Sequence, residues 1–437
     1  MEIIRHRILQ RLFSILLLTV VISSCKKESI NTTESAVWIK VLEDSTITST
    51  DEEVYGGQNG KVITDDDDNI YLYFYSNNLQ QTTVMQCSPT GNPVWRKTLN
   101  GFVGMDIIRL NDGSVVVAGT NPTISNKELQ LHAFRMNGTV ETLKFDLGGL
   151  NLNPQRVENA NMAALLDNSI MISACYYYSF GNNFYSYCFA KISPAFLLKW
   201  TSKLNNPYMP SFGIFGPSFT QNSILPISNN RFLFQYAVSQ DPAIVTAGSF
   251  GISTGILRDE AAPDTQYVDT AFYYKSGTYS QSAGGNTGVQ NRYTNGLLAD
   301  GSGGFIHHYS CPQILGGYPS IPAGFIRIGA DATINDTIPI PLSNDYRIIS
   351  CNLNQGRFLM TAYKSEVLSG TPDFNAYRTL FLTGGMDLNT TKTFSLQNFY
   401  SDFFSSIAPT KDGGFIIFGK IQSFNGSSNK VVLVKWK

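Results

Sequence analysis

The densest group of potential metal ligands in the sequence is Asp65-Asp-Asp-Asp-Asn69. Carboxylate and amide oxygens are hard ligands, so this run could bind calcium. It stands, however, at the place that Asn111-Asp112-Gly113 takes in a later copy of the same sequence pattern. Because Asp, Asn and Gly are the residues that tight turns need, we interpret the run as a solvated turn.

Histidine and cysteine offer little further chemistry. No Cys-x-x-Cys spacing occurs in the chain. His307 and His308 are neighbours on a predicted strand, so their side chains point to opposite faces and do not chelate one ion together. His132 is isolated in the sequence. We therefore predict no catalytic residue, no metal site and no cofactor.

Tyrosines are concentrated between Cys175 and Cys188, around a two-residue Gly181-Asn182 turn that predicts a β-hairpin. That turn would put three pairs opposite one another: Tyr176 with Tyr187, Tyr178 with Tyr185, and Cys175 with Cys188. The cysteine pair could form a disulfide in an oxidising compartment. Four tyrosines on one face could stack on sugar rings or contact a protein, or they could pack the hairpin against its neighbours. Further aromatic residues are predicted in loops on the same side of the molecule, namely Tyr208, Phe212, Tyr273 and Tyr274.

The first residues indicate export. Arg5, Arg7 and Arg11 precede an apolar run over residues 12–22, followed by Ser23-Ser24-Cys25. This is the order of a secretory signal, and the run is too short for a spanning helix. Small residues directly before a cysteine resemble the bacterial lipobox, a resemblance that implies diacylation of Cys25 and cleavage before it. The alternative is an ordinary signal peptide with a cysteine there by chance. We expect a signal peptide over residues 1–24, the lipidated cysteine and a polar tether over 25–35, and one domain over 36–437.

The rest of the chain is organised by a repeated hairpin, clearest in Lys411-Asp-Gly-Gly-Phe-Ile-Ile-Phe-Gly-Lys420. Degenerate copies with Asp/Asn/Gly turns between apolar strands recur seven times, which predicts an all-β, seven-bladed β-propeller of four-stranded antiparallel blades. The seventh copy has only three strands after residue 401. The segment Ala36-Val-Trp38-Ile-Lys-Val-Leu42 resembles the fourth strands of other copies, so we expect it to pair beside residues 431–435 and close the ring.

Composition limits the classes of partner. Charged residues make up only 15% of the chain, and 32 basic against 33 acidic residues give a net charge of -1. Without a basic stripe, nucleic-acid binding is not expected. The Asp-Gly-Gly hairpin at 412–419 and the fourth strands with Trp-x-Lys resemble secreted β-propeller lipoproteins of Bacteroidetes-type bacteria. That resemblance implies an outer-membrane or cell-surface location and a binding or scaffolding role.

Two functions remain open from the sequence. Long connections on one side of the predicted ring favour a module that binds a glycan or an envelope protein. The alternative is a carbohydrate-active hydrolase or lyase with carboxylates at the mouth of the central channel. Ser88-Pro-Thr-Gly-Asn-Pro-Val-Trp95 has only the ends of the Asp-box found in propeller hydrolases and lacks its aspartate.

Overall fold

A computed structural model describes the chain in the ranges 36–45, 60–76, 79–122, 125–146, 156–180, 182–203, 224–228, 231–239, 250–258, 268–274, 296–301, 303–311, 321–329, 334–340, 346–365, 377–385, 392–394, 401–422 and 429–437. These ranges form β-strands and turns. Within them, no helix is long and apolar enough to cross a membrane.

The described strands form seven four-stranded antiparallel sheets, which we number as blades 1 to 7. Blades 1 to 3 are consecutive in sequence: β2 (Gly60–Thr64), β3 (Ile70–Ser76), β4 (Gln81–Cys87) and β5 (Pro93–Asn100); β6 (Val103–Arg109), β7 (Val115–Asn121), β8 (Ser125–Phe134) and β9 (Val140–Asp146); β10 (Arg156–Ala164), β11 (Ile170–Phe180), β12 (Asn182–Ile192) and β13 (Leu198–Lys203).

Blades 4 to 6 repeat this order: β14 (Ile224–Ser228), β15 (Arg231–Ser239), β16 (Phe250–Arg258) and β17 (Val268–Tyr274); β18 (Gly296–Ala299), β19 (Phe305–Cys311), β20 (Ile321–Ile328) and β21 (Ile334–Pro339); β22 (Tyr346–Asn354), β23 (Arg357–Ser365), β24 (Tyr377–Gly385) and β25 (Lys392–Phe394). Blade 7 combines the two ends of the described chain: β26 (Ser401–Pro409), β27 (Phe415–Gln422), β28 (Asn429–Trp436) and β1 (Ala36–Ser45).

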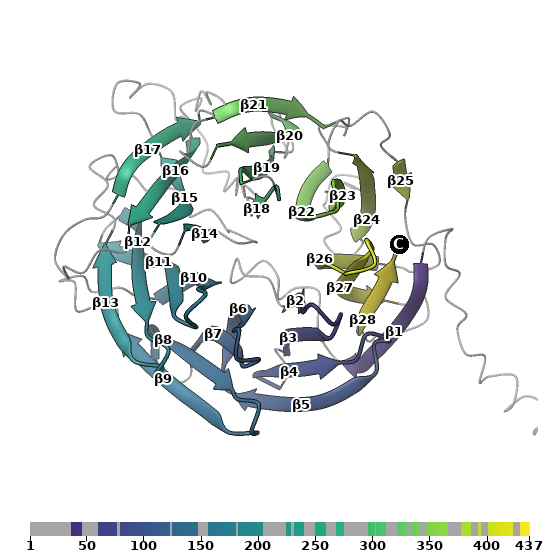
Figure 1. Cartoon of the computed structure of the whole chain (residues 1–437), viewed down its shortest axis with the longest axis horizontal. Coiled ribbons are helices and arrows are strands. Elements are labelled where there is room, and N and C mark those ends of the chain that lie inside the picture. The colour runs from purple at the N-terminus through teal and green to yellow at the C-terminus, as the bar shows by residue number, and fades with distance from the viewer. Residues whose placement is uncertain are drawn as a thin grey trace, which may run out of the picture.

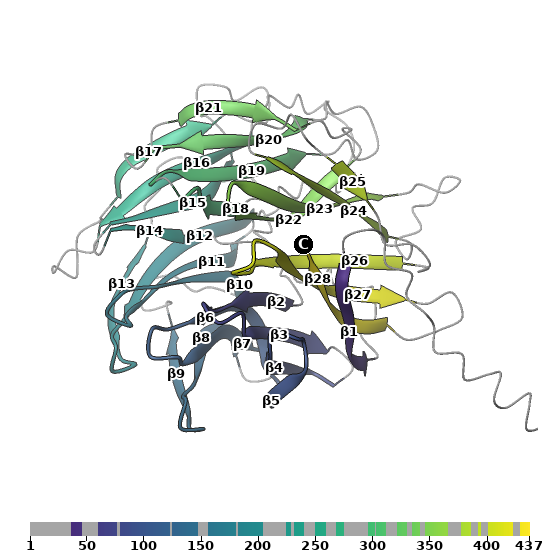
Figure 2. The same cartoon turned by 45° about the vertical axis from the view of Figure 1, so that its right-hand side comes forward.

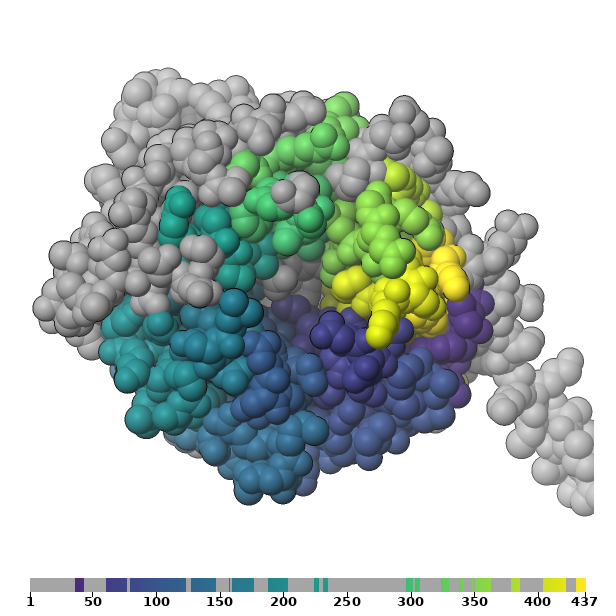
Figure 3. Space-filling view, in the orientation of Figure 1, coloured from purple at the N-terminus to yellow at the C-terminus, as the bar shows by residue number. Residues whose placement is uncertain are grey.

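The blades are arranged around a central axis, with the first strand of each blade innermost (Figure 1). Each inner strand contacts the inner strand of the next blade, and β26 of blade 7 contacts β2 of blade 1. The space-filling view shows the described blades as neighbouring sectors around a hollowed centre (Figure 3). The chain is therefore an all-β propeller built of four-stranded antiparallel blades.

The N-terminal strand completes blade 7, as the sequence predicts. β1 runs antiparallel to β28, with Trp38 opposite Lys435 and Val41 opposite Val432, and the two strands lie side by side in both cartoon views (Figures 1 and 2). Trp38 also covers the outer turn of blade 1, since a Cβ placed on Gly91 would lie 2.7 Å from its ring. β1 therefore joins blade 7 to blade 1.

The core lies between the faces of neighbouring blades. β3 is buried along its whole length, because one face of blade 1 packs on blade 7 and the other on blade 2. A strand covered on both faces must be apolar throughout, which explains the run Ile-Tyr-Leu-Tyr-Phe-Tyr of this strand. Aromatic rings span several joints between blades, as Phe74 with Phe418 and Phe381 with Phe404 illustrate.

Connections leave the blades on two faces. We call the face that bears the connections between first and second strands, and between third and fourth strands, the turn face. The opposite face, with the connections between second and third strands and between blades, is the loop face. On the turn face, residues 65–69, 110–114, 165–169 and 410–414 each form a five-residue connection closed by backbone hydrogen bonds.

Candidate functional site

The predicted tyrosine hairpin exists, but its register differs from the prediction by one residue. β11 and β12 pair up to Phe180 opposite Asn182, so one residue separates the paired ends where a two-residue turn was expected. Tyr176 therefore lies opposite Ser186, and Tyr178 opposite Phe184. A one-residue shift moves side chains to the other face of a sheet, so the predicted tyrosine pairing is wrong.

The remaining two tyrosines of that hairpin follow the same shift: Tyr185 lies opposite Tyr177, and Tyr187 opposite Cys175. Tyr176 is fully buried in a core cluster, so it packs the blade and is not open to a ligand. The side chains of Tyr178, Tyr185 and Tyr187 lie outside the described residues, and a binding role for them stays a prediction.

The same shift separates the two cysteines. Cys188 lies opposite Ala174 and packs in the cluster that contains Tyr176, whereas Cys175 lies opposite Tyr187. Paired residues share a face and sequence neighbours do not. Cys175 and Cys188 therefore lie on opposite faces of blade 3, and the predicted disulfide between these buried cysteines is not formed.

The other predicted binding residues fall into two groups. Tyr273 and Tyr274 were expected in a loop, but they belong to β17, the outer strand of blade 4, where they pair with Ser253 and Ile252. Alternating β-branched and aromatic residues from Val268 onward favour this strand. Tyr208, Phe212 and the proposed lipid anchor Cys25 lie outside the described residues.

The acidic run of blade 1 is a turn whose carboxylates bind the protein itself. Asp65 accepts hydrogen bonds from the amides of Asp67 and Asn69 and from the hydroxyl of Tyr71. Asp68 accepts a hydrogen bond from the amide of Lys411 in blade 7, at 2.7 Å. Among the described residues, no group of three or more His, Cys, Asp or Glu side chains is placed to hold a metal ion.

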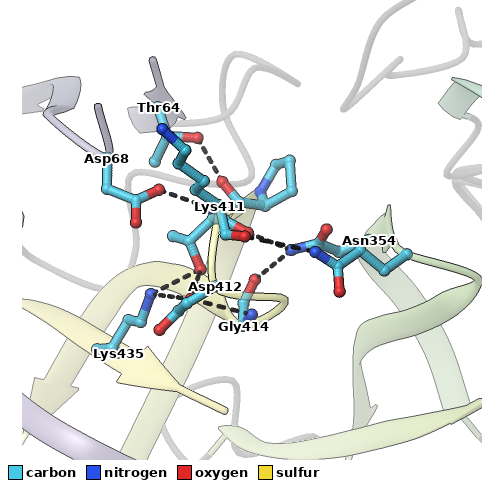
Figure 4. Close-up of polar contacts among 10 residues, drawn as sticks. Thr64, Asp68, Asn354, Lys411, Asp412, Gly414 and Lys435 are labelled. Atoms are coloured by element: carbon cyan, nitrogen blue, oxygen red, sulfur yellow. Dashed lines mark hydrogen bonds and ion pairs between the residues drawn. The ribbon is translucent and has the colours of Figure 1, made fainter. Parts of the chain in front are cut away.

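Side chains of one turn hold the backbone of the next turn across the turn face (Figure 4). Asn354 of blade 6 donates from Nδ2 to the carbonyl oxygens of Thr410 and Gly414 in blade 7, each at 2.7 Å. On the other side of that turn, Thr64 of blade 1 donates to the carbonyl oxygen of Pro409. Buried or half-buried carbonyl groups need such partners, so these contacts link blades 6, 7 and 1.

Asp412 closes the turn of blade 7 from within. Its Oδ1 atom accepts hydrogen bonds from Lys435 Nζ at 2.8 Å, from Thr410 Oγ1 at 2.7 Å and from the amide of Gly414. Burial alone would raise the pKa of Asp412, but the hydrogen bonds and the charge of Lys435 outweigh it and hold this pKa well below its usual range. Gly413 has a φ of 82°, which explains why the Asp-Gly-Gly sequence needs glycine there.

A charged joint links three blades near the central axis. Lys61 Nζ of blade 1 lies 2.5 Å from Asp106 Oδ1 of blade 2. Asp106 Oδ2 accepts a hydrogen bond of 2.6 Å from the amide of Met162 in blade 3. Asp106 is almost fully buried. Burial of the Tyr73 hydroxyl group and the charge of neighbouring Asp106 raise the pKa of Tyr73 well above its usual value. Sequence reasoning missed this joint.

Blade 7 makes the same joint with an uncharged residue. Ser406 Oγ accepts a hydrogen bond of 3.1 Å from the amide of Val62 in blade 1. Ser406 lies opposite Phe418 and four residues before its turn, as Asp106 lies opposite Ala118 and four residues before its turn. The inner-strand position therefore serves to bind the next blade, whichever acceptor occupies it.

Comparisons with known proteins support the fold. No protein-family model matches the chain, and no curated protein sequence matches it. The extracellular domains 1–2 of Drosophila Semaphorin 1a superimpose with a TM-score of 0.51 at 9% identity, over 92% of this chain and 88% of that one. The Dos1 propeller gives a TM-score of 0.45 at 10% identity, over 86% and 76%. A protein of unknown function from Dyadobacter fermentans gives 0.43 at 10% identity, over 91% and 99%. At these identities the similarity shows the β-propeller fold alone.

Proposed function

We propose that this chain is a lipid-anchored envelope protein whose seven described blades are the complete ring, and that it binds a glycan or an envelope protein on its loop face. The anchor is the lipid on Cys25, and the location is the outer membrane or cell surface. The propeller acts as a binding or scaffolding module.

The proposal is supported by the difference between the connections on the turn face and those on the loop face. On the turn face, most turns whose residues are described are five residues long, and polar side chains and carbonyl groups of several of them bind neighbouring turns. The connections at the loop face vary much more in length, from one position between β11 and β12 to 20 or more between some blades. Positions 204–223 (20 residues) and 275–295 (21 residues) connect blades there, and the first of them contains Tyr208 and Phe212. Long connections on a rigid scaffold are where binding residues concentrate.

Four of the described carboxylates have structural partners. Asp65, Asp106, Asp167 and Asp412 each accept hydrogen bonds from backbone amides of their own blade or the next one. A general acid or nucleophile needs a carboxyl group that faces substrate. These four groups are instead engaged in holding turns and joints.

A glycan array probed with the full-length protein in detergent tests the binding role. We expect binding by the wild type and its loss in a variant with Tyr208→Ala and Phe212→Ala. The matched control is Met136→Ala, an exposed residue of the turn face, which should bind as the wild type does. Unchanged binding by the double variant would refute the aromatic loop site. If the wild type binds no glycan, the protein-partner form is tested by crosslinking in intact cells from position 208.

Metabolic labelling with an alkyne fatty acid tests the anchor separately. We expect Cys25 to incorporate the lipid and Cys25→Ala to abolish both labelling and membrane association. Labelling that persists in Cys25→Ala would show that the anchor is elsewhere, and no labelling of the wild type would favour an ordinary signal peptide.

A further inference from the structure

Three exposed apolar side chains stand at the tips of neighbouring turns on the turn face of blades 2 and 3. Met136 is 75% exposed, Leu166 is 79% exposed and Leu197 is 59% exposed. We call these three residues the apolar turn cluster. Scattered single apolar residues on a surface are ordinary, but several that project together mark a contact surface.

The turns that carry the cluster are fastened to one another. Asn111 of blade 2 donates from Nδ2 to the carbonyl oxygen of Leu166, at 2.9 Å. Met136 lies over the turn of its own blade, since a Cβ on Gly113 would be 3.1 Å from its Cγ. The guanidinium group of Arg135 lies 5.5 Å from the ring centre of Phe196, the residue before Leu197. The turns that carry the three side chains are therefore in contact with their neighbours.

The acidic residues of these turns are exposed but engaged by the protein itself. Asp112 accepts a hydrogen bond from the amide of Ser114 and pairs with Arg135 at 3.3 Å. Asp167 accepts hydrogen bonds from both the amide and the hydroxyl of Ser169, each at 2.9 Å. The tips therefore present exposed apolar side chains beside carboxylates whose hydrogen bonds and ion pair lie within their own blade.

The N-terminal strand begins on this same face. Ala36, the first residue of β1, lies opposite Trp436, and Trp436 lies opposite Phe415 in β27. Phe415 directly follows the turn 410–414 of the turn face. The polar segment 26–35 therefore joins Cys25 to the turn face at the rim of blade 7.

The length of that segment favours one orientation. Ten residues span at most about 35 Å when fully extended. A strand of seven or eight residues, such as β27 or β28, rises about 25 Å. To bring the loop face to a bilayer, the segment would have to run nearly extended along the whole outer rim. With the turn face toward the bilayer, the segment does not have to span the height of the blade.

We propose that the apolar turn cluster contacts the bilayer to which the chain is anchored, so that the loop face points away from the membrane. This inference rests on the proposed lipid anchor. Tethering places the turn face at a high effective concentration near the lipid, so a small apolar surface suffices. Leu and Met side chains are driven into the interface by removal of their apolar surface from water.

Fluorescence quenching in reconstituted vesicles tests the contact. The full-length lipidated protein is labelled with an environment-sensitive fluorophore at Leu166→Cys and reconstituted into phosphatidylcholine vesicles that contain brominated lipid. The matched control is Leu79→Cys, since Leu79 is 57% exposed and lies in the connection between β3 and β4 on the loop face. Cys87, Cys175, Cys188 and Cys351 are buried, and wild-type protein taken through the same labelling measures the background, including any label on Cys311.

The outcomes separate this inference from the anchor. We expect co-flotation with vesicles, strong quenching at position 166 and none at position 79; the quenching should be lost when Met136→Asp and Leu197→Asp are added. Co-flotation without quenching at position 166 would overturn the membrane contact and leave the anchor standing. Quenching at position 79 would reverse the proposed orientation. Failure to float would refute the anchor and the inference together.

Discussion

Removal of the Asp106 carboxylate should open the joint between blades 1, 2 and 3. Asp106→Ala deletes the partner of Lys61 and the acceptor of the Met162 amide. It also removes a hydrogen bond of 2.8 Å from the amide of Ile107. Lys61 is left as a largely buried ammonium group, with 13% of its side chain exposed. Breaking a buried pair from one side costs about 3–5 kcal/mol of unfolding free energy, and we expect a loss in that range.

A double-variant cycle separates the charge from the hydrogen bond. Lys61→Met combined with Asp106→Ser removes both charges and recreates the joint that Ser406 makes with Val62. Replacing a buried ion pair by well-packed neutral residues is often close to neutral, so the double variant should lie within about 1 kcal/mol of the wild type. The coupling energy between the two positions should then reach about 2 kcal/mol or more.

Urea unfolding of the full chain, followed by tryptophan fluorescence and by circular dichroism, measures these differences as midpoints and slopes. Both probes must give the same transition for the free energies to be compared. If Asp106→Ala costs less than about 1 kcal/mol, or if the costs of the two single changes simply add, the carboxylate does not hold the joint and the reasoning fails.

Three further perturbations test other parts of the ring. Trp38→Ala should cost about 2 kcal/mol, because it uncovers Gly91 and loosens the closing strand, whereas exposed Val37→Ala should change urea stability by less than about 0.5 kcal/mol. Burial and the charge of Lys144 lower the pKa of His132 to about 4; since the folded pKa lies below the unfolded value, stability is present above about pH 6.5 and is lost as pH falls toward 4. His132→Gln should flatten urea stability between pH 5 and 7, and an unchanged slope would contradict the burial of the ring. Gly119→Ala should lower the thermal midpoint strongly, as its Cβ would meet the Val103 carbonyl; a loss no larger than that of an exposed alanine substitution would show that the strands can separate.

Much of the fold follows from short-range sequence pattern. The Asp-Gly-Gly turn at 412–414 predicts its hairpin because glycine with positive φ and a turn aspartate are local requirements. The closing strand was also predictable, since an unpaired edge in blade 7 demands a partner and Trp38 matches other fourth strands. Both predictions concern the backbone alone. They could be made from the sequence because any apolar strand can make the backbone hydrogen bonds that they require.

The tyrosine hairpin shows where such reasoning stops. A Gly-Asn pair fits a two-residue turn, but the register of β11 and β12 is set by which residues fill the core between blades. Tyr176, Ala174 and Cys188 share one buried face with residues of blade 2. The sequence around residue 181 does not contain that information, so the local turn signal gave a register wrong by one residue.

The joint at Asp106 was hidden for a different reason. Lys61, Asp106, Asn161 and Ser406 all stand four residues before their turns, yet they differ in residue type, charge and size. Aligning these four copies on their turns would have revealed a polar position within apolar strands, although blade 5 has Gly296 there. In blades 2 and 7 this position supplies an acceptor, because the buried amide of the next inner strand needs a partner, and an aspartate or a serine can provide it.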